Sequence, residues 1–111
     1  RQRASLLLQS GATTHRVDVA DIVYAESVKH RIDVHTLSGV YSVVSTLKAM
    51  EAELAGHNFF RSNSCHLVSL AHVRGVSDQE CLMTGGDSLR ISRPRRKAFM
   101  SALADYAGGI D

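Results

Sequence analysis

Residues 22–44 decide the fold, and they read IVYAESVKHRIDVHTLSGVYSVV. Between positions 31 and 36, polar side chains alternate with apolar or β-branched ones, which is the two-residue period of a strand with one buried face. Ser38-Gly39 is a typical tight-turn dipeptide. The stretch therefore predicts three consecutive strands, Ile22–Ser27, Ile32–Leu37 and Val40–Val44.

The same rhythm of short β-branched segments and turns continues on both sides of this stretch. Ser10-Gly11 marks a turn between two segments that we expect to form a hairpin, Ser5–Gln9 and Thr14–Val19. Beyond residue 60, four more strands are predicted: His66–Leu70, Val73–Val76, Glu80–Met83 and Ser88–Ile91. Regular short strands with glycine-containing turns favour a mainly β, antiparallel architecture.

Two segments have the period of a helix instead. Thr46–Ala55 carries apolar residues three and four positions apart, with Ser45 as the expected N-cap and Gly56 as the expected stop. Pro94–Tyr106 has a similar apolar face, and Pro94 suits the first helical position. Short helices are therefore predicted at about 46–55 and 94–106.

The size and composition are those of one globular domain, residues 1–111. Hydrophobic residues make up 44% and charged residues 22%, which argues against a disordered chain. No apolar run approaches the roughly 20 residues that span a bilayer, and no signal peptide follows Arg1-Gln2-Arg3. Because the first residue is arginine, we expect the chain to be a fragment of a longer protein.

Cysteine and histidine usage points away from catalysis and metal binding. Cys65 and Cys81 show no CxxC spacing, so we expect two buried free thiols in a reducing compartment, the cytoplasm. Cys65, His66 and His72 could supply zinc ligands, but their spacing matches no structural site. The chain contains no HExxH, GxSxG, P-loop or dinucleotide motif. We therefore predict no enzyme activity, no metal and no cofactor.

Basic residues gather near the C-terminus of a nearly neutral chain. The formal net charge is +2, and residues 56–111 hold seven basic against five acidic side chains. Five of these seven lie within Arg90–Lys97. Such a local cluster favours an anionic partner, while an ordinary solvated helix start explains it equally well.

Three polar tips interrupt the predicted strands. They are Lys29-His30-Arg31, Arg61-Ser62-Asn63-Ser64 and Ser92-Arg93. Because the residue before proline is held extended, we expect Arg93 at a corner before the helix rather than inside it. Arginine, asparagine and serine side chains can grip phosphates or read base edges. Each tip alone could also be an ordinary polar loop.

The order of these segments resembles the LytTR family of DNA-binding domains, from about Leu6 to Tyr106. The resemblance is carried by four stretches: Asp21–Ser27 with Lys29-His30-Arg31, Ser45–Glu51, Phe59–Val73 and Leu89–Phe99. In the second tip the chain departs from the usual family pattern, with Asn63-Ser64-Cys65 and then His66 where the family has an aromatic residue.

The resemblance implies an elongated, ten-stranded antiparallel β fold with short helices. It implies a non-enzymatic, sequence-specific DNA-binding domain of a bacterial transcription regulator, the output domain of a two-component response regulator. The implied partners are double-stranded DNA, with promoter direct repeats as sites, an N-terminal receiver domain, and a second copy through dimerisation on DNA. No membrane partner is implied.

The resemblance also assigns DNA-binding residues, which read major grooves with loops. The first loop carries Lys29, His30 and Arg31, the second Asn63, Ser64 and Cys65, and the third Ser92 and Arg93. Thr46 and Lys48 match positions near the phosphate backbone, and the basic cluster adds Arg95, Arg96 and Lys97 as expected phosphate contacts. We expect the bases to be selected by His30, by Asn63 or Ser64, and by Arg93. The alternative from another class is a β-rich protein-interaction or ligand-sensing module whose basic corner is incidental; a Cys/His hydrolase is a third.

Overall fold

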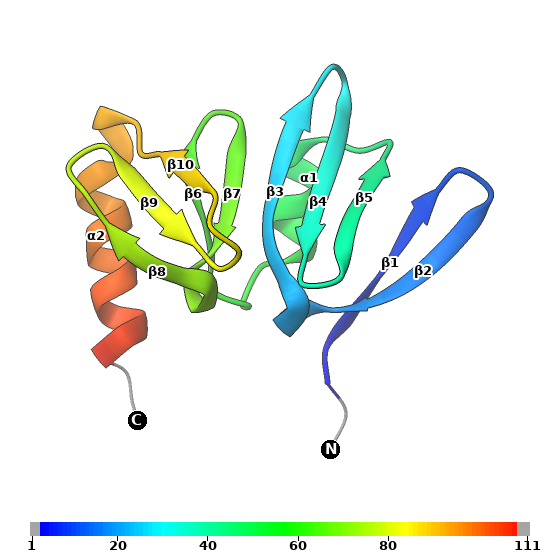
Figure 1. Ribbon diagram of the computed structural model, residues 1–111, viewed down its shortest axis with the longest axis horizontal. Helices are drawn as coiled ribbons and strands as arrows, with labels where there is room; N and C mark the ends of the chain where they lie inside the picture. Colours follow the sequence, from blue (N-terminus) through cyan, green and yellow to red (C-terminus); the bar gives the residue numbers. More distant parts are fainter. Residues whose placement is uncertain (1–2, 109–111) are drawn as a thin grey trace.

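The computed structural model describes residues 3–108 and shows ten strands in three antiparallel sheets (Figure 1). The strands are β1 (Ser5–Ser10), β2 (Thr13–Asp18), β3 (Ile22–Val28), β4 (Arg31–Thr36), β5 (Gly39–Val43), β6 (Phe59–Asn63), β7 (His66–Ser69), β8 (Val73–Val76), β9 (Glu80–Met83) and β10 (Ser88–Arg90). The helices are α1 (Leu47–Glu53) and α2 (Arg93–Gly108), with short 3-10 turns η1 (Val19–Asp21) and η2 (Leu70–His72). The predicted mainly β, antiparallel fold with two helices is confirmed.

The five-stranded sheet, in the order β5-β4-β3-β7-β6, forms the middle of the molecule. Neighbouring residues of a strand face opposite sides of a sheet. On β3, buried Tyr24 and Ala25 therefore face different hydrophobic cores. The register repeats this division on β7, where Val68 pairs with Tyr24 and Leu67 pairs with Ala25.

Each face of the central sheet is covered by different elements. The first core fills the space toward α1 and the β1–β2 hairpin, with Leu8, Val34 and Met50 among its buried residues. The second core lies toward the β8–β10 sheet and α2, and Phe99 of α2 is fully buried in it. The molecule measures 40 × 37 × 24 Å. It is therefore extended in two directions, as a flat slab, and not in one direction, as a rod.

Helix α1 begins one residue later than predicted. The expected cap was Ser45, but Thr46 is the N-cap, and its hydroxyl accepts a hydrogen bond from the Ala49 backbone N–H at 3.0 Å. The helix ends at Glu53, and the chain then turns through Gly56, which has a φ of +85°. The prediction of Ser45 was wrong. In the sequence, the hydroxyl of Ser45 or of Thr46 could cap the helix, and only the path of the backbone decides between them.

Helix α2 begins at Arg93, so the prediction that Arg93 lies outside the helix was wrong. The corner lies at Ser92, whose carbonyl accepts a hydrogen bond from the Arg95 N–H at 3.0 Å. This bond closes the first turn around Arg93 and Pro94. Proline fits there because the first helical N–H groups have no partner within the helix. No helix within residues 3–108 is long and apolar enough to cross a membrane.

Strand β6 has no counterpart among the strands predicted from periodicity. Its residues Arg61 and Ser62 were interpreted as part of a polar tip, yet Ser62 is fully buried. β6 pairs with β7, and its Phe60 ring packs against Phe99 with centroids 5.8 Å apart. The strand is therefore held by tertiary packing rather than by its own hydrophobic pattern.

The two cysteines differ from each other. Cys81 is buried in the second core, as predicted, but Cys65 is exposed. The prediction of a buried Cys65 was wrong because this residue lies in the β6–β7 turn and not in β7. Both thiols are free.

Candidate nucleic-acid interface

The three polar tips lie along one edge of the molecule, at the top of Figure 1. The β3–β4 turn, the β6–β7 turn and the junction between β10 and α2 all reach this edge, and α1 begins toward it. We call residues 29–31, 63–65 and 91–93 the loop edge. The sequence could not show that the tips share an edge, because it is the sheet order that brings them together.

The first tip is a strained two-residue turn. Lys29 has a φ of +47° and His30 a φ of +67°, and both side chains are exposed. Two consecutive positive φ values define the turn that suits the twist of a β-hairpin and that glycine or asparagine normally occupies. Arg31 is held differently, because its guanidinium donates to the hydroxyl and carbonyl oxygens of Ser42 at 2.9 and 3.1 Å.

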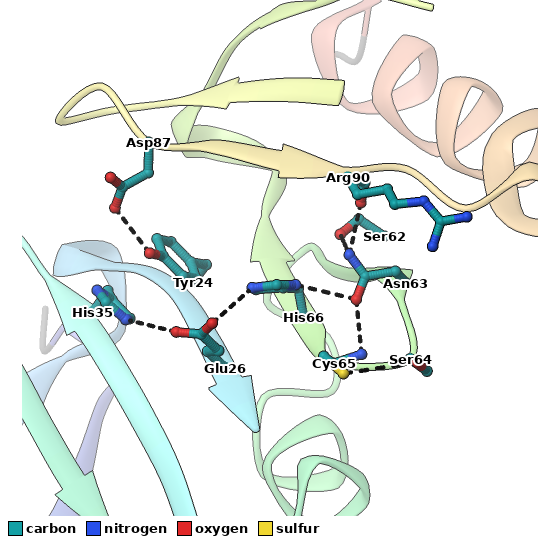
Figure 2. Close-up of polar contacts among 10 residues, drawn as sticks. All are labelled: Tyr24, Glu26, His35, Ser62, Asn63, Ser64, Cys65, His66, Asp87 and Arg90. Atoms are coloured by element: carbon teal, nitrogen blue, oxygen red, sulfur yellow. Dashed lines mark hydrogen bonds and ion pairs between the residues drawn. The ribbon is translucent and has the colours of Figure 1, made fainter. Parts of the chain in front are cut away.

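The second tip is organised by the side chain of Asn63, which is only 7% exposed. Its Nδ2 donates to the Arg90 carbonyl at 2.7 Å, and its Oδ1 accepts from the Cys65 N–H at 2.7 Å (Figure 2). Ser64 and Cys65 form the turn itself and are exposed. Asn63 thus shapes the turn from inside, while its two neighbours face solvent.

The third tip is joined directly to the second. The Ser92 N–H donates to the Ser62 carbonyl at 2.8 Å, beside the bond from Asn63 to Arg90. Arg93 is exposed. Two hydrogen bonds therefore hold the β6–β7 turn and the start of α2 in a fixed relation.

One further bond links strand β3, just before the first tip, to this pair. The Ser27 N–H, at the end of β3, donates to the Cys65 carbonyl at 2.9 Å. The three tips are consequently held at one edge, although the first and the third lie about sixty residues apart in the sequence.

An arginine-lined cleft of about 230 Å³ opens beside the third tip. Arg96 is fixed there by donating to the Ser77 carbonyl at 2.9 Å. The N-terminal end of α2 adds the positive end of a helix dipole nearby. The positive charges of this cleft favour an anion, although Asp78 adds one negative charge to the lining. The lining residues are Asp78, Gln79, Arg90, Ile91, Arg93 and Arg96.

The remaining predicted residues lie at the starts of the helices. Lys48 and Lys97 are exposed, and Arg95 is half-buried. The Thr46 hydroxyl is used to cap α1, as described above. The structure thus gathers these residues near the loop edge but gives Thr46 a structural task as well.

A polar cluster behind the second tip was not predicted from the sequence (Figure 2). The Glu26 carboxylate lies between two imidazoles, 3.4 Å from His35 Nε2 and 3.3 Å from His66 Nε2. The signal was present in the strand pattern, since Glu26 pairs with His66 across β3 and β7. It could be read only once the strand order was known.

Tyr24 closes one side of this cluster. Its ring stacks on His35 with centroids 4.1 Å apart, and its hydroxyl donates to Asp87 at 2.8 Å. Burial, together with the hydrogen bond to Asp87, raises the pKa of Tyr24 far above its usual value. The phenol therefore stays neutral and acts as a fixed donor.

Within the described residues, Cys65, His66 and His72 do not form a group of neighbouring ligand atoms. His72 is buried at η2 and bonds to the Ala20 carbonyl and the Thr84 hydroxyl, not to Cys65 or His66. Glu26, Asp33 and His35 place potential ligand atoms within 4.8 Å of one another. A structural zinc site uses four ligands, so we assign no metal to this group.

Comparisons with known proteins agree with the geometry. Residues 12–104 match the sequence model of the LytTr DNA-binding domain, which describes a DNA-binding family and not an enzyme family. A solved LytTr DNA-binding domain of a methyl-accepting/DNA response regulator from Bacillus cereus superposes with a TM-score of 0.80 and 17% identity, covering 92% of this chain and 98% of that one. The resemblance inferred from sequence is confirmed.

Two curated relatives are transcription or signalling regulators. The CO-responsive transcriptional regulator RcoM of Rhodospirillum rubrum is 36% identical over 100 residues, which cover 85% of this chain and 42% of RcoM. The sensory transduction protein LytT of Bacillus subtilis is 26% identical over 103 residues, which cover 88% of this chain and 43% of LytT. The chain thus spans less than half the length of either relative. With a family match over residues 12–104 and the same fold, the chain belongs to the LytTR DNA-binding domain family, and its function is DNA binding.

Proposed function

We propose that this domain binds double-stranded DNA sequence-specifically through the loop edge, with the tips entering major grooves. The observation that carries the proposal is that hydrogen bonds join the second tip to the third and to strand β3 beside the first, so that exposed donors of all three tips lie at one edge. Loops held this rigidly can dock with little loss of conformational entropy.

Base reading is assigned to the exposed side chains. Arg93 supplies a planar fork that can bind guanine at two atoms, a contact typically worth about 1–3 kcal/mol of discrimination. His30 and Ser64 are the readers proposed for the first and second tips. Asn63 contributes by holding the β6–β7 turn in place, because its amide is already bonded to Arg90 and Cys65.

Phosphate contacts supply register and most of the salt-dependent affinity. We assign them to Lys29, Lys48, Arg95 and Lys97, and to the arginine-lined cleft at the start of α2. The remaining residues of the proposed interface either hold the local structure or line the edge. They are Arg31, Thr46, Cys65, Ser92 and Arg96.

The domain is proposed to act as the output part of a longer, cytoplasmic bacterial regulator. Support comes from the two relatives, which are more than twice as long as the matched region and are named as a transcriptional regulator and a sensory transduction protein. An N-terminal receiver domain, and dimerisation on promoter direct repeats, belong to this proposal.

The test is selection of bound duplexes from a randomised DNA library, followed by anisotropy titrations on the selected and a scrambled duplex. We expect enrichment of one sequence, and affinity that falls steeply between about 50 and 200 mM salt, with a slope of about 0.9 per neutralised phosphate on logarithmic axes. Absence of an enriched sequence, together with absence of salt-dependent DNA binding, would favour the protein-interaction alternative.

A further inference from the structure

His66 lies between two hydrogen-bond acceptors, one on each ring nitrogen (Figure 2). Nδ1 is 3.1 Å from Asn63 Oδ1, and Nε2 is 3.3 Å from Glu26 Oε2. The imidazole is largely buried, with 17% of its side chain exposed. Solvent therefore has limited room to replace either contact.

The hydrogen bonds of Asn63 determine which atom of its amide faces His66 Nδ1. Its oxygen accepts from the Cys65 N–H, and its nitrogen donates to the Arg90 carbonyl. Exchanging the two atoms would place a donor against a donor at Cys65 and an acceptor against an acceptor at Arg90. The atom that faces His66 is therefore an acceptor.

A neutral imidazole carries one N–H and can satisfy only one of these acceptors. The second contact then sets a nitrogen lone pair against an oxygen lone pair. The imidazolium donates from both nitrogens, and a hydrogen bond from a charged donor is stronger than one from a neutral donor. The arrangement around His66 is thus complete only in its protonated form.

From this arrangement we infer that His66 is a positioning residue for DNA binding: when protonated at both nitrogens, it bridges Glu26 and Asn63 and fixes the β6–β7 turn in the conformation that meets DNA. The inference rests on the proposed function of the loop edge. It predicts that loss of the proton at higher pH loosens the turn and lowers DNA affinity.

The other groups around His66 do not supply the missing proton. On β3, Tyr24 has its hydroxyl committed to Asp87, and Glu26 faces a second imidazole, His35 of β4. Asp33 lies opposite Glu26 across the β3–β4 register and adds another acceptor charge. Within the described residues, both ion pairs of Glu26 are with histidines, so no lysine or arginine takes the place of the His66 proton.

The protonation state is tested first without DNA, by ¹⁵N NMR of the imidazole in the intact domain between about pH 5.5 and 8. We expect two N–H signals from His66 at the low end, and loss of one at the high end together with faster exchange of the Cys65 amide proton. A neutral His66 with a bare Nδ1 at pH 5.5, or a Cys65 amide that is indifferent to pH, would overturn the inference.

The consequence for DNA is tested with Glu26→Gln, which keeps the shape of the side chain. The glutamine amide can donate to Nε2, so a neutral His66 with its proton on Nδ1 satisfies both neighbours. In the original chain we expect affinity for the selected duplex to fall about tenfold between about pH 6 and 8, within the range for a hydrogen bond to a charged group. In Glu26→Gln the fall should be less than about threefold.

The control is His57→Gln, which removes an exposed histidine outside the loop edge. It should keep the tenfold fall. Any contribution of His30 is the same in the original chain and in both variants, so it cancels in the comparison. Equal pH profiles for the original chain and Glu26→Gln would refute the inference, whereas absence of DNA binding at every pH would refute the proposed function itself.

Discussion

The first tip and the joined second and third tips are built in opposite ways. Lys29 and His30 are exposed and positioned by a local turn, with both φ values in the left-handed region. Ser62 and Asn63 are buried and bond to residues about thirty positions away in the chain. One part of the loop edge is therefore shaped by local backbone geometry, and the other by long-range assembly of two sheets and a helix.

The difference indicates how each part should respond to change. A local turn forms with its hairpin and tolerates substitution, provided that the backbone can adopt positive φ. The second and third tips are joined by hydrogen bonds between elements that pack on the second core. We therefore expect their shape to depend on the stability of the whole domain. Four experiments should separate these behaviours.

The largest effect is expected from Asn63→Ala, which breaks the joined tips. It leaves the Arg90 carbonyl and the Cys65 N–H without partners, so the free energy of unfolding should fall by about 2–3 kcal/mol. Affinity for the selected duplex should fall about 100-fold as the β6–β7 turn loosens. Urea denaturation and anisotropy titrations measure the two effects.

The matched control is Ser64→Ala, at the exposed neighbour in the same turn. It should leave the free energy of unfolding within about 0.5 kcal/mol of the original value. If both substitutions destabilise the domain equally, Asn63 is not the organiser of the turn.

The second effect concerns Arg93, the exposed end of the joined tips. Arg93→Ala should weaken binding to the selected duplex by about 10- to 100-fold and to scrambled DNA far less, because the proposed guanine contact is lost. Arg93→Lys should restore the non-specific part only, since lysine lacks the planar fork. The melting temperature should not change. Equal losses on both duplexes, with a lower melting temperature, would instead make Arg93 a structural corner residue.

The third experiment acts on the first tip alone. Replacing Lys29-His30 by Asn-Gly gives the turn its preferred residues and should raise the free energy of unfolding by about 1 kcal/mol. DNA affinity should fall by about threefold to tenfold, as a phosphate contact and a base reader are lost. Thermal melting and anisotropy give the two readouts. A stabilised variant with undiminished affinity would exclude this tip from the interface.

The smallest effect distinguishes two neighbouring cations of α2. Lys97→Ala should reduce the logarithmic salt slope by about one unit on every duplex without affecting stability. Arg96→Ala should do the same and, because it loses its bond to the Ser77 carbonyl, should also lower the free energy of unfolding by about 1 kcal/mol. Salt titrations and urea denaturation check both; an unchanged slope in Lys97→Ala would remove that residue from the phosphate contacts.

The parts of the fold that could be predicted from the sequence are those that depend on local pattern. The alternation in Arg31–Thr36 and the turn at Ser38-Gly39 predicted β4 and β5 to within a residue or two. Strand β6 could not be found this way, because buried Ser62 looks like a loop residue until its carbonyl is seen to accept from Ser92. The exposure of Cys65 depends on the exact bounds of the β6–β7 turn, which the polar stretch before it does not fix.

In the candidate site too, the features that depend on local pattern could be predicted, and those that depend on long-range contacts could not. The exposed tips could be predicted as polar interruptions between strands. The task of Asn63 could not, because both of its strong bonds are to backbone groups, one of them 27 residues away. The cluster of Glu26, His35 and His66 was equally hidden, since it depends on the order β4-β3-β7 within the sheet.

The bonds that unite the tips run largely through the main chain. The Ser92 N–H donates to the Ser62 carbonyl, and the Ser27 N–H donates to the Cys65 carbonyl. These backbone groups would remain if the side chains of the four residues were replaced. The frame of the edge is therefore largely independent of the residues that it displays at positions 64 and 93. With base reading at these exposed positions, as proposed, substitution there changes the DNA target and leaves the fold of the loops as it is.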